Sequence, residues 1–209
     1  MASGLVKDAG LGFKEYLLRG IGYVMAHLVH RPKVYGRKPS IDKPTIFACR
    51  HVGMMDPVIL MDEYPSILMH PLVADDYYEK NGFTRFFYDT ACCIPIDRHN
   101  SSRKWMYDSQ AVLQKGEHII IFPEGRRNKE GGGLLPFKTG AAYLAGLTGA
   151  QIVPVYNKFW KFPHRYRLAI GEPFELDPVP EGDATSEWAH AQTARIQEAV
   201  TALAPLLGE

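Results

Sequence analysis

The sequence has few of the features that mark several large classes of protein. It contains only three cysteines in 209 residues, Cys49, Cys92 and Cys93. An odd number without a C-x-x-C pair argues against a disulfide framework and a zinc site, and it fits a reducing cytoplasm. Charge of one sign is also scarce, because 24 basic residues are balanced by 23 acidic residues. This balance argues against general nucleic-acid binding and against an acidic tail.

The first thirty residues lack both an export signal and a membrane-spanning run. They do not combine a charged segment, an apolar run and a small-residue cleavage site. Their longest charge-free apolar run, residues 20–30, is well short of the roughly 20 residues that cross a bilayer as a helix. The sequence therefore predicts a protein that does not span the membrane.

The same N-terminal segment has the spacing of an amphipathic helix. Its charged residues cluster away from an apolar face. That face could lie in the headgroup plane of a membrane, or it could pack on the rest of the domain. We take residues 1–36 as this helical segment, with contact to a membrane as one alternative, and residues 37–209 as a single further domain. The apolar face consists of Val6, Phe13, Leu17, Val24 and Leu28.

Residues 37–209 alternate between strand patterns and helix patterns. Several of the strands are apolar throughout, which is typical of strands covered on both faces. The length allows one sizeable core, and no Pro/Gly/Ser-rich linker divides the chain. The sequence predicts an α/β domain with a mixed, mostly parallel sheet flanked by helices. The expected strands are TIFAC (45–49), SILMHPLV (66–73), CCIPID (92–97), EHIIIF (117–122), QIVPVY (151–156) and YRLAIGE (166–172).

Helix signals lie between these strands. Proline favours the first helical position, which makes Asp56 the predicted N-cap of a helix that begins at Pro57. The other helices are expected from Ser101 or Ser102 to near Gly116, from Phe137 to Gly149, and from Ser186 to Pro205.

His51 and Asp56 lie where the strand TIFAC meets the next helix. Ligands of open α/β sheets bind at the carboxyl ends of strands, so this histidine is well placed for a substrate. Residues five apart on a continuous helix point about 140° from each other, so the two side chains can meet only if the chain turns between them. Asp56 could then orient His51 as a general base toward a hydroxyl group. Alternatively, Asp56 only caps its helix and His51 is a surface histidine.

Two more strands carry distinctive residues. Arg98 follows the strand IPID, and its planar guanidinium is suited to bidentate phosphate binding. An ordinary surface ion pair with Asp97 is the alternative. The segment IVPV (152–155) is explained as core, with Pro154 restricting its strand to an edge or a bulge.

The segment FPEGRRN (122–128) follows the strand HIIIF. Gly125 would let the backbone approach a ligand closely, and Arg127 could add a second phosphate contact. A basic surface turn is the alternative interpretation.

Together, and in this order, these four segments resemble the glycerolipid acyltransferase family, which includes the 1-acylglycerol-3-phosphate acyltransferases. HVGMMD (51–56) is similar to the family's H-x-x-x-x-D motif and FPEGRRN to its F-P-E-G-T-R-S block. IPIDR (94–98) and IVPV are similar to its second and fourth blocks. The resemblance runs from Thr45 to Leu176, so residues 37–209 are the expected acyltransferase domain.

The resemblance implies a catalytic dyad of His51 and Asp56. It also implies a fatty acyl donor, acyl-CoA or an acyl carrier protein, and a lysophospholipid acceptor such as 1-acylglycerol-3-phosphate. Transfer would be direct, without a metal or other cofactor, and the chain has no G-x-S-x-G nucleophile elbow. A peripheral position on the cytoplasmic face of a membrane would suit these partners. The residues expected to bind the acceptor are Arg98, Phe122, Pro123, Glu124, Gly125 and Arg127.

Three departures from the family pattern leave the acceptor open. Arg50, Gly53 and Arg126 stand where the family often has Asn, Ser and Thr. Arg126 could suit a more anionic acceptor or could point into solvent. An amino-acid lipid or a glycolipid is therefore an alternative acceptor.

Two rival functions come from other motifs. The stretch NKFWKFPHRYR (157–167) mixes aromatic and basic residues, as a lipid-binding module without enzymatic activity would, or as a hairpin with a solvated face would. Ser101 to Lys104 and Lys138-Thr139-Gly140 match the S-x-x-K and K-T-G elements of serine β-lactamases. The S-D-N element is missing, and K-T-G opens a predicted helix where those enzymes need a strand, so coincidence is the better explanation.

Overall fold

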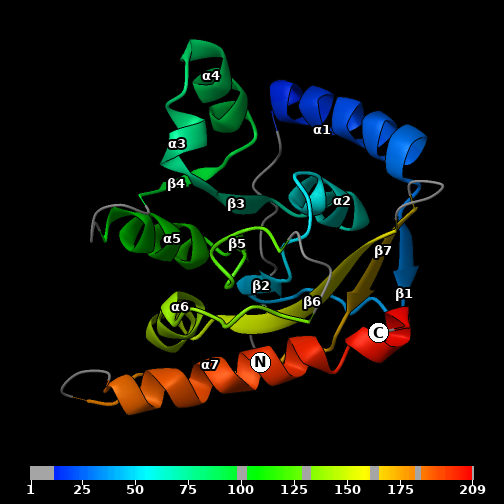
Figure 1. The fold of residues 1–209 in the computed structure, drawn as a ribbon. Coiled ribbons are helices and arrows are strands. Elements are labelled where there is room, and N and C mark those ends of the chain that lie inside the picture. Colours follow the sequence, from blue (N-terminus) through cyan, green and yellow to red (C-terminus); the bar gives the residue numbers. More distant parts are fainter. Residues whose placement is uncertain (1–11, 98–102, 129–132, 161–164, 182–184, 209) are drawn as a thin grey trace, which may run out of the picture.

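A computed structural model describes residues 12–97, 103–128, 133–160, 165–181 and 185–208. At its centre is a seven-stranded sheet in the order β1-β7-β6-β2-β5-β3-β4, with helices on both faces (Figure 1). Neighbouring strands are parallel except for the antiparallel pair β6 and β7. The predicted mixed, mostly parallel α/β architecture is confirmed. The strands are β1 (Lys33–Tyr35), β2 (Thr45–Cys49), β3 (Met69–Ala74), β4 (Ile94–Ile96), β5 (His118–Ile121), β6 (Gln151–Trp160) and β7 (Arg165–Ile170).

The central strands are buried on both faces, as their apolar runs predict. Every residue of β2 and of β5 is buried. Because successive side chains of a strand point to opposite faces, Ile46 and Ala48 belong to one core, and Phe47 and Cys49 belong to the other. The helices that pack on the first core are α5 (Lys104–Gln114), α6 (Gly140–Thr148) and α7 (Ser186–Thr201), and α2 (Asp56–Glu63) packs on the second.

The N-terminal helix lies outside the sheet. Helix α1 (Phe13–Met25) continues into a π-helical turn, η1 (Ala26–His30), and passes beside α2 (Figure 1). Its apolar face is exposed rather than packed on the domain, since Phe13 and Leu28 are 81% and 75% exposed. Val6, predicted for the same face, lies outside the described residues. In the part of the chain that the structure describes, no helix has the length and apolar character needed to cross a membrane.

The predicted N-terminal segment, residues 1–36, is not helical throughout. The helix ends at Arg31, whose backbone adopts the left-handed conformation with φ 46°. Residues 33–35 then form β1 and pair with β7 at one edge of the sheet. The end of the predicted segment therefore belongs to the sheet domain.

Most other helix boundaries follow the sequence signals. Helix α6 ends at Gly149 in the left-handed conformation, φ 68°, as predicted. The N-cap of α7 is Thr185, whose side chain accepts a hydrogen bond from Trp188 N, one residue before the predicted Ser186. The predicted caps of α5, residues 101–102, lie outside the described residues. The chain ends in a 3-10 helix, η2 (Ala204–Leu207).

Two short helices between β3 and β4 have no counterpart among the predicted elements. They are α3 (Asp75–Tyr78) and α4 (Gly82–Thr90). Asn81 caps α4 in a capping box with Thr84. No residue of α4 is buried, and Phe83 and Phe86 are exposed. Helices α4 and α1 stand side by side above the sheet (Figure 1).

Pro154 lies in an interior strand, beside an interruption in its neighbour. Strand β6 is flanked by β2 and β7. The ladder between β6 and β7 stops at Val155 and Ile170, and an isolated bridge between Ile152 and Phe174 continues the pairing. Pro154 falls in this gap, where its missing N–H costs no ladder bond. The edge alternative is therefore wrong, and Pro154 lies opposite an interruption in the β6–β7 ladder.

Candidate active site

Two loops at the carboxyl edge of the sheet carry most of the predicted site. Residues 50–55 follow β2 and residues 122–128 follow β5. The loops leave the sheet at the same edge because β2 and β5 are parallel neighbours. The backbone N–H of Asn128 donates to the carbonyl of His51 at 2.7 Å, which ties the two loops together.

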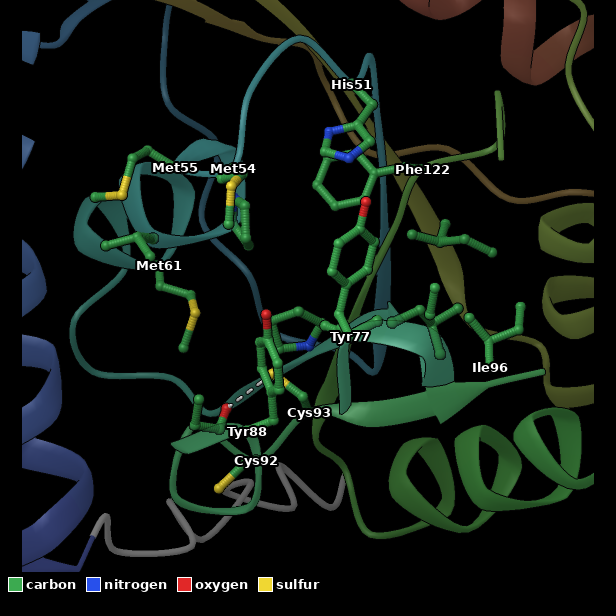
Figure 2. Close-up of a pocket in the computed structure, with 18 of the residues that line it drawn as sticks. His51, Met54, Met55, Met61, Tyr77, Tyr88, Cys92, Cys93, Ile96 and Phe122 are labelled. Carbon is green, nitrogen blue, oxygen red and sulfur yellow. Dashed lines mark hydrogen bonds between the residues drawn. The ribbon is translucent and has the colours of Figure 1, made fainter. Parts of the chain in front are cut away.

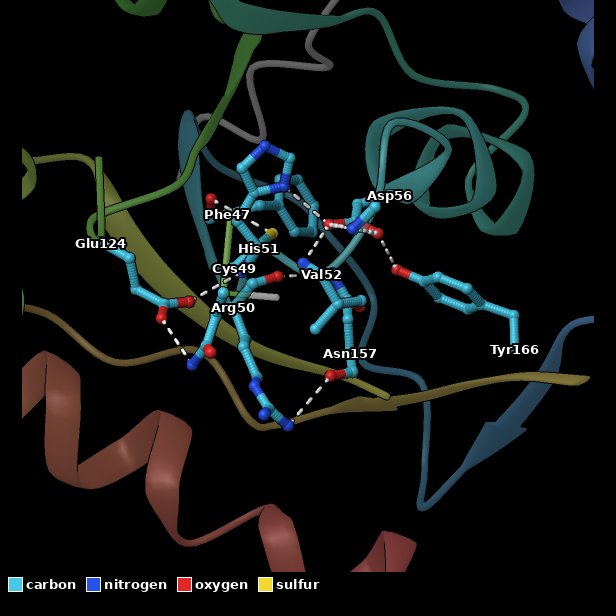
Figure 3. Close-up of polar contacts among 11 residues, drawn as sticks. Phe47, Cys49, Arg50, His51, Val52, Asp56, Glu124, Asn157 and Tyr166 are labelled. Carbon is cyan, nitrogen blue, oxygen red and sulfur yellow. Dashed lines mark hydrogen bonds and ion pairs between the residues drawn. The ribbon is translucent and has the colours of Figure 1, made fainter. Parts of the chain in front are cut away.

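His51 and Asp56 face each other across the turn between β2 and α2 (Figure 3). His51 Nδ1 lies 2.8 Å from Asp56 Oδ2. An ionised carboxylate can only accept, so Nδ1 carries the proton and Nε2 keeps its lone pair. The imidazole is 20% exposed, whereas the carboxylate of Asp56 is fully buried. The pair thus has the geometry of a general base held by a carboxylate, as the predicted turn requires.

Asp56 is held by donors on three sides. It is the first residue of α2, and Met55 occupies the N-cap position. Asp56 is therefore not the N-cap that the sequence predicts. Its carboxylate turns back toward the preceding loop. Its donors are Val52 N (2.7 Å), Gly53 N (3.0 Å), Tyr166 Oη (2.5 Å) and His51 Nδ1.

Tyr166 is a residue of the site that the sequence did not predict. This tyrosine lies on β7, and its side chain is almost fully buried at 1% exposure. Burial, and then the neighbouring carboxylate of Asp56, raise the pKa of Tyr166 well above its ordinary value, so the hydroxyl stays protonated and donates. Its only signal in the sequence is an aromatic residue within a strand pattern.

Glu124 supports the backbone and does not line the cavity. Its Oε1 accepts from the backbone N–H of His51 at 2.8 Å. Its Oε2 accepts from Leu135 N at 2.9 Å and from Asn128 Nδ2 at 3.3 Å. The side chain is buried, so both oxygens are occupied by protein donors. The structure therefore places Glu124 behind the loop of His51 and not among the described residues that line the cavity, and its expected role in binding the acceptor stays a prediction.

Arg50 is also buried behind this loop. Its guanidinium donates to Tyr156 Oη at 2.8 Å and stacks over the Tyr156 ring at 4.7 Å. The backbone carbonyl of Arg50 accepts a hydrogen bond from Asn157 Nδ2 at 2.9 Å. Arg50 is absent from the cavity wall formed by the described residues. The departure from the family pattern at this position thus lies in the interior.

A cavity of about 910 Å³ extends from His51. Figure 2 shows His51 and Phe122 at one end of it, with Tyr77 and Tyr88 farther along. The His51 ring stacks on Phe122, with 4.1 Å between centroids and 27° between the planes. Most of the wall is apolar. Its methionines and cysteines are Met25, Met54, Met55, Met61, Cys92 and Cys93.

The cavity wall also carries cationic side chains. Arg126, Arg127 and Lys138 line the cavity. Gly125 has φ 68°, and a Cβ at this position would lie 2.7 Å from Lys138 Cε. The glycine thus permits the close approach of a lysine stem, and the close approach of a ligand to Gly125 stays a prediction.

The remaining predicted site residues divide into two groups. Phe122, Pro123, Gly125 and Arg127 all border the cavity. Arg98 lies outside the described residues. Arg126 is exposed but also borders the cavity, so its orientation combines the two alternatives considered from the sequence. Lys138 was missed as a site residue.

A model of the acyltransferase family matches residues 31–158. The chain belongs to the acyltransferase family. The matched residues include both loops of the site, and they end before Tyr166 on β7.

Individual relatives agree with this family. A Caenorhabditis elegans protein that bears the name 1-acyl-sn-glycerol-3-phosphate acyltransferase acl-2 is 31% identical over 160 residues, which cover 70% of this acyltransferase and 55% of the relative. The chain thus spans about half the length of that relative. The 1-acyl-sn-glycerol-3-phosphate acyltransferase of Bacillus subtilis is 25% identical over 79% of this chain and 86% of its own.

A solved structure shares the fold of this acyltransferase. The crystal structure of PlsC from Thermotoga maritima, a 1-acyl-sn-glycerophosphate acyltransferase, aligns with a TM-score of 0.67 at 18% identity. The alignment covers 93% of this chain and 80% of PlsC.

Proposed function

We propose that this acyltransferase moves a fatty acyl group from a thioester donor to the free hydroxyl of a lysophospholipid of the 1-acyl-sn-glycerol-3-phosphate type. The observation that carries the proposal is the His51–Asp56 pair, whose histidine lines a large, mostly apolar cavity that three cationic side chains also border. The names of the relatives support the same acceptor. The donor is acyl-CoA or an acyl carrier protein, and it is a co-substrate rather than a cofactor.

In the proposed reaction, His51 Nε2 takes the proton of the acceptor hydroxyl as the oxygen attacks the thioester carbonyl. The carbon–sulfur bond breaks when the tetrahedral intermediate collapses. The leaving thiolate takes the proton from His51, which gives an ester and a free thiol. Asp56 stabilises the imidazolium that forms in between. Such general-base catalysis contributes about a hundredfold to ten-thousandfold.

The cavity wall has groups for both parts of a lysophospholipid. Arg127, with Arg126 and Lys138, can bind a phosphate through charge-assisted hydrogen bonds. The methionine-rich wall suits acyl chains, because methionine side chains adapt to varied apolar shapes. Glu124 and Asn128 act indirectly in this proposal, by holding the backbone of His51.

Two exposed helices support a peripheral position on a membrane, which we place at its cytoplasmic face. Phe13 and Leu28 of the N-terminal helix and Phe83 and Phe86 of α4 are all exposed. Helices α1 and α4 also contribute side chains to the cavity wall, so a lipid leaving the bilayer could enter between them. Sedimentation with phospholipid vesicles tests this position. The double variant Phe83→Ser, Phe86→Ser is expected to bind vesicles less than the wild type, and equal binding would contradict it.

The central experiment measures thiol release from a long-chain acyl-CoA and from an acyl carrier protein, with and without lysophosphatidic acid. We compare the wild type with His51→Ala and with His190→Ala, an exposed histidine on α7. Release that depends on the acceptor and is lost only in His51→Ala supports the proposal. Release without acceptor would indicate a thioesterase. Release that His51→Ala leaves unchanged would contradict the role of His51 as the general base. No thiol release from the wild type under any of these conditions would favour the lipid-binding module.

The acceptor is tested through Arg127. Arg127→Ala is expected to raise KM for lysophosphatidic acid about tenfold or more, because a charge-assisted contact to phosphate is lost. KM for the acyl donor should stay unchanged. If the variant and the wild type have equal KM values for lysophosphatidic acid, the phosphate is bound elsewhere, and the amino-acid lipid or glycolipid acceptors become the better candidates.

A further inference from the structure

We infer that Tyr166 is a positioning residue of the catalytic pair and that strand β7 completes the active site from outside the segment shared with the family model. The inference rests on the proposed function for its kinetic consequences. The contact itself belongs to the structure, since Tyr166 Oη donates to Asp56 Oδ1 at 2.5 Å (Figure 3).

The two oxygens of Asp56 have different tasks. Oδ2 faces His51 Nδ1 at 2.8 Å and Val52 N at 2.7 Å. Oδ1 accepts from Tyr166, and Gly53 N lies 3.0 Å from either oxygen. Tyr166 therefore holds the side of the carboxylate that the histidine does not reach. Without the hydroxyl, the carboxylate can rotate away from the orientation in which Oδ2 meets the imidazole.

The surroundings of Tyr166 hold its ring in place. The side chain is 1% exposed and belongs to the core cluster on the α2 face of the sheet, together with Cys49 and Val155. The ring of His30 meets it edge-on at 6.5 Å. In the β6–β7 pair, Tyr166 is in register with Phe159. Because β6 runs parallel to β2, this register brings β7 to the edge of the sheet where His51 emerges.

Loss of this hydrogen bond should alter catalysis in two ways. Hydrogen bonds to charged groups are among the stronger ones in proteins, and their loss corresponds to roughly a tenfold effect on kcat or more. The hydroxyl also spreads the negative charge of Asp56. When it is removed, more charge remains on Oδ2, which favours the protonated form of His51. The acid limb of the pH–rate profile should then move to higher pH.

Replacement of the Tyr166 hydroxyl leaves the charges around the pair unchanged. The titratable and charged groups close to the pair belong to other residues. They are Cys49 and Arg50 at or just after the end of β2, Glu124 beside the backbone of His51, and His30 against the Tyr166 ring. The cations of the cavity wall, Arg126, Arg127 and Lys138, belong to other segments. A shift in the profile can therefore be assigned to the hydroxyl itself.

The experiment compares Tyr166→Phe with Tyr64→Phe. Tyr64 is a suitable control because it is buried in the same core cluster, and its hydroxyl donates to Pro39 O, away from the pair. The readouts are kcat, KM for donor and acceptor, the pH–rate profile, and the protonation midpoint of His51 followed by NMR. Tyr166→Phe should lower kcat about tenfold with unchanged KM values. It should also move both midpoints up by about half a pH unit. Tyr64→Phe should change none of these.

A second variant keeps every heavy atom of the tyrosine. Site-specific 3-fluorotyrosine at position 166 is a stronger donor, so both midpoints should move to lower pH, opposite to Tyr166→Phe. Equal behaviour of Tyr166→Phe and Tyr64→Phe, or shifts of one sign in both Tyr166 variants, would overturn the inference. The NMR midpoint needs no turnover. A wild-type protein without transferase activity would thus refute the proposed function and still leave the role of Tyr166 testable.

Discussion

The two halves of the sheet differ in whether their strands border the cavity. In the closed half, formed by β1, β7, β6 and β2, no described side chain borders the cavity. In the open half, formed by β5, β3 and β4, all three strands contribute to the cavity wall. His51 emerges from β2, at the boundary between the halves. The closed half thus supplies a rigid support for the catalytic pair, while the open half provides room for the substrates.

The largest effect is expected at the boundary, from Asp56→Asn. An amide in this position can present its own N–H group to His51 and to the backbone N–H groups of Val52 and Gly53, which are themselves donors. The neutral amide also no longer stabilises the imidazolium. We expect kcat to fall about a thousandfold or more, with smaller changes in KM. Thiol release under saturating substrates measures this. If Asp56→Asn retains more than a tenth of the wild-type kcat, the carboxylate of Asp56 is not needed for turnover and the pair does not act as proposed.

The same substitution in each half should separate stability from turnover. Leu168 on β7 is fully buried, so Leu168→Ala should lower the free energy of unfolding by about 2–5 kcal/mol and leave kcat within about twofold. Leu72 on β3 borders the cavity and is only partly buried. Leu72→Ala should cost less stability and change KM for the lipid substrates. Urea unfolding and steady-state kinetics on both variants check this, and the reverse ranking would erase the distinction between the halves.

A smaller effect is expected when the cavity of the open half is filled. Cys93 borders the cavity close to Tyr88 (Figure 2). Burial raises the pKa of Cys93 to about 12, so the thiol is neutral and acts as a small apolar group. Cys93→Phe should reduce turnover of a long-chain donor about tenfold more than that of a short-chain donor. A series of acyl-CoA chain lengths measures the ratio, with Cys49→Ser as a control for the loss of a thiol outside the cavity. Equal losses for all chains would show that acyl groups do not reach Cys93.

Six of the seven strands could be predicted from the sequence, in both halves of the sheet, whereas β1 was missed. Their apolar runs, such as residues 45–49 and 151–156, predict burial on both faces. The pairing of His51 with Asp56 was also predictable, because it is a local turn before a helix. Helix α4 was missed although Phe83, Phe86 and Phe87 recur at helical spacing and Asn81 begins a capping box with Thr84.

Contacts between distant parts of the chain were not predictable. Tyr166 reaches Asp56 from 110 residues farther along the chain, and nothing local distinguishes it from other tyrosines in strands. The partners of Glu124 were not predictable from its motif either. Its motif indicates an acceptor site, but its carboxylate is used by Leu135 and by the backbone of His51. The pattern identifies which residues belong to the site, and the long-range register of the sheet decides what each one contacts.

The smallest expected effect concerns a histidine of the open half that lies outside the cavity. His118 begins β5, is 5% exposed, and its Nδ1 has no hydrogen-bond partner among the described residues. Burial lowers its pKa from 6.5 to about 4, with a contribution from the neighbouring His70. The pKa of His70 is lowered by burial as well, although Glu117 lies 2.7 Å from its Nε2.

The sign of the resulting pH dependence follows from proton binding. Between pH 6.5 and about 4 the unfolded chain binds a proton at His118 that the folded chain does not bind. The contribution of the neutral His118 to the free energy of unfolding is therefore complete above pH 6.5 and is lost as the pH drops toward 4. In His118→Asn the slope should be shallower by up to about 1.4 kcal/mol per pH unit. Urea unfolding at several pH values measures it, with the exposed His190→Asn as the control. Because His118 lies outside the cavity, kcat of His118→Asn should equal that of the wild type at pH 7, and a loss of turnover would mean that the amino ends of the strands also support the catalytic pair.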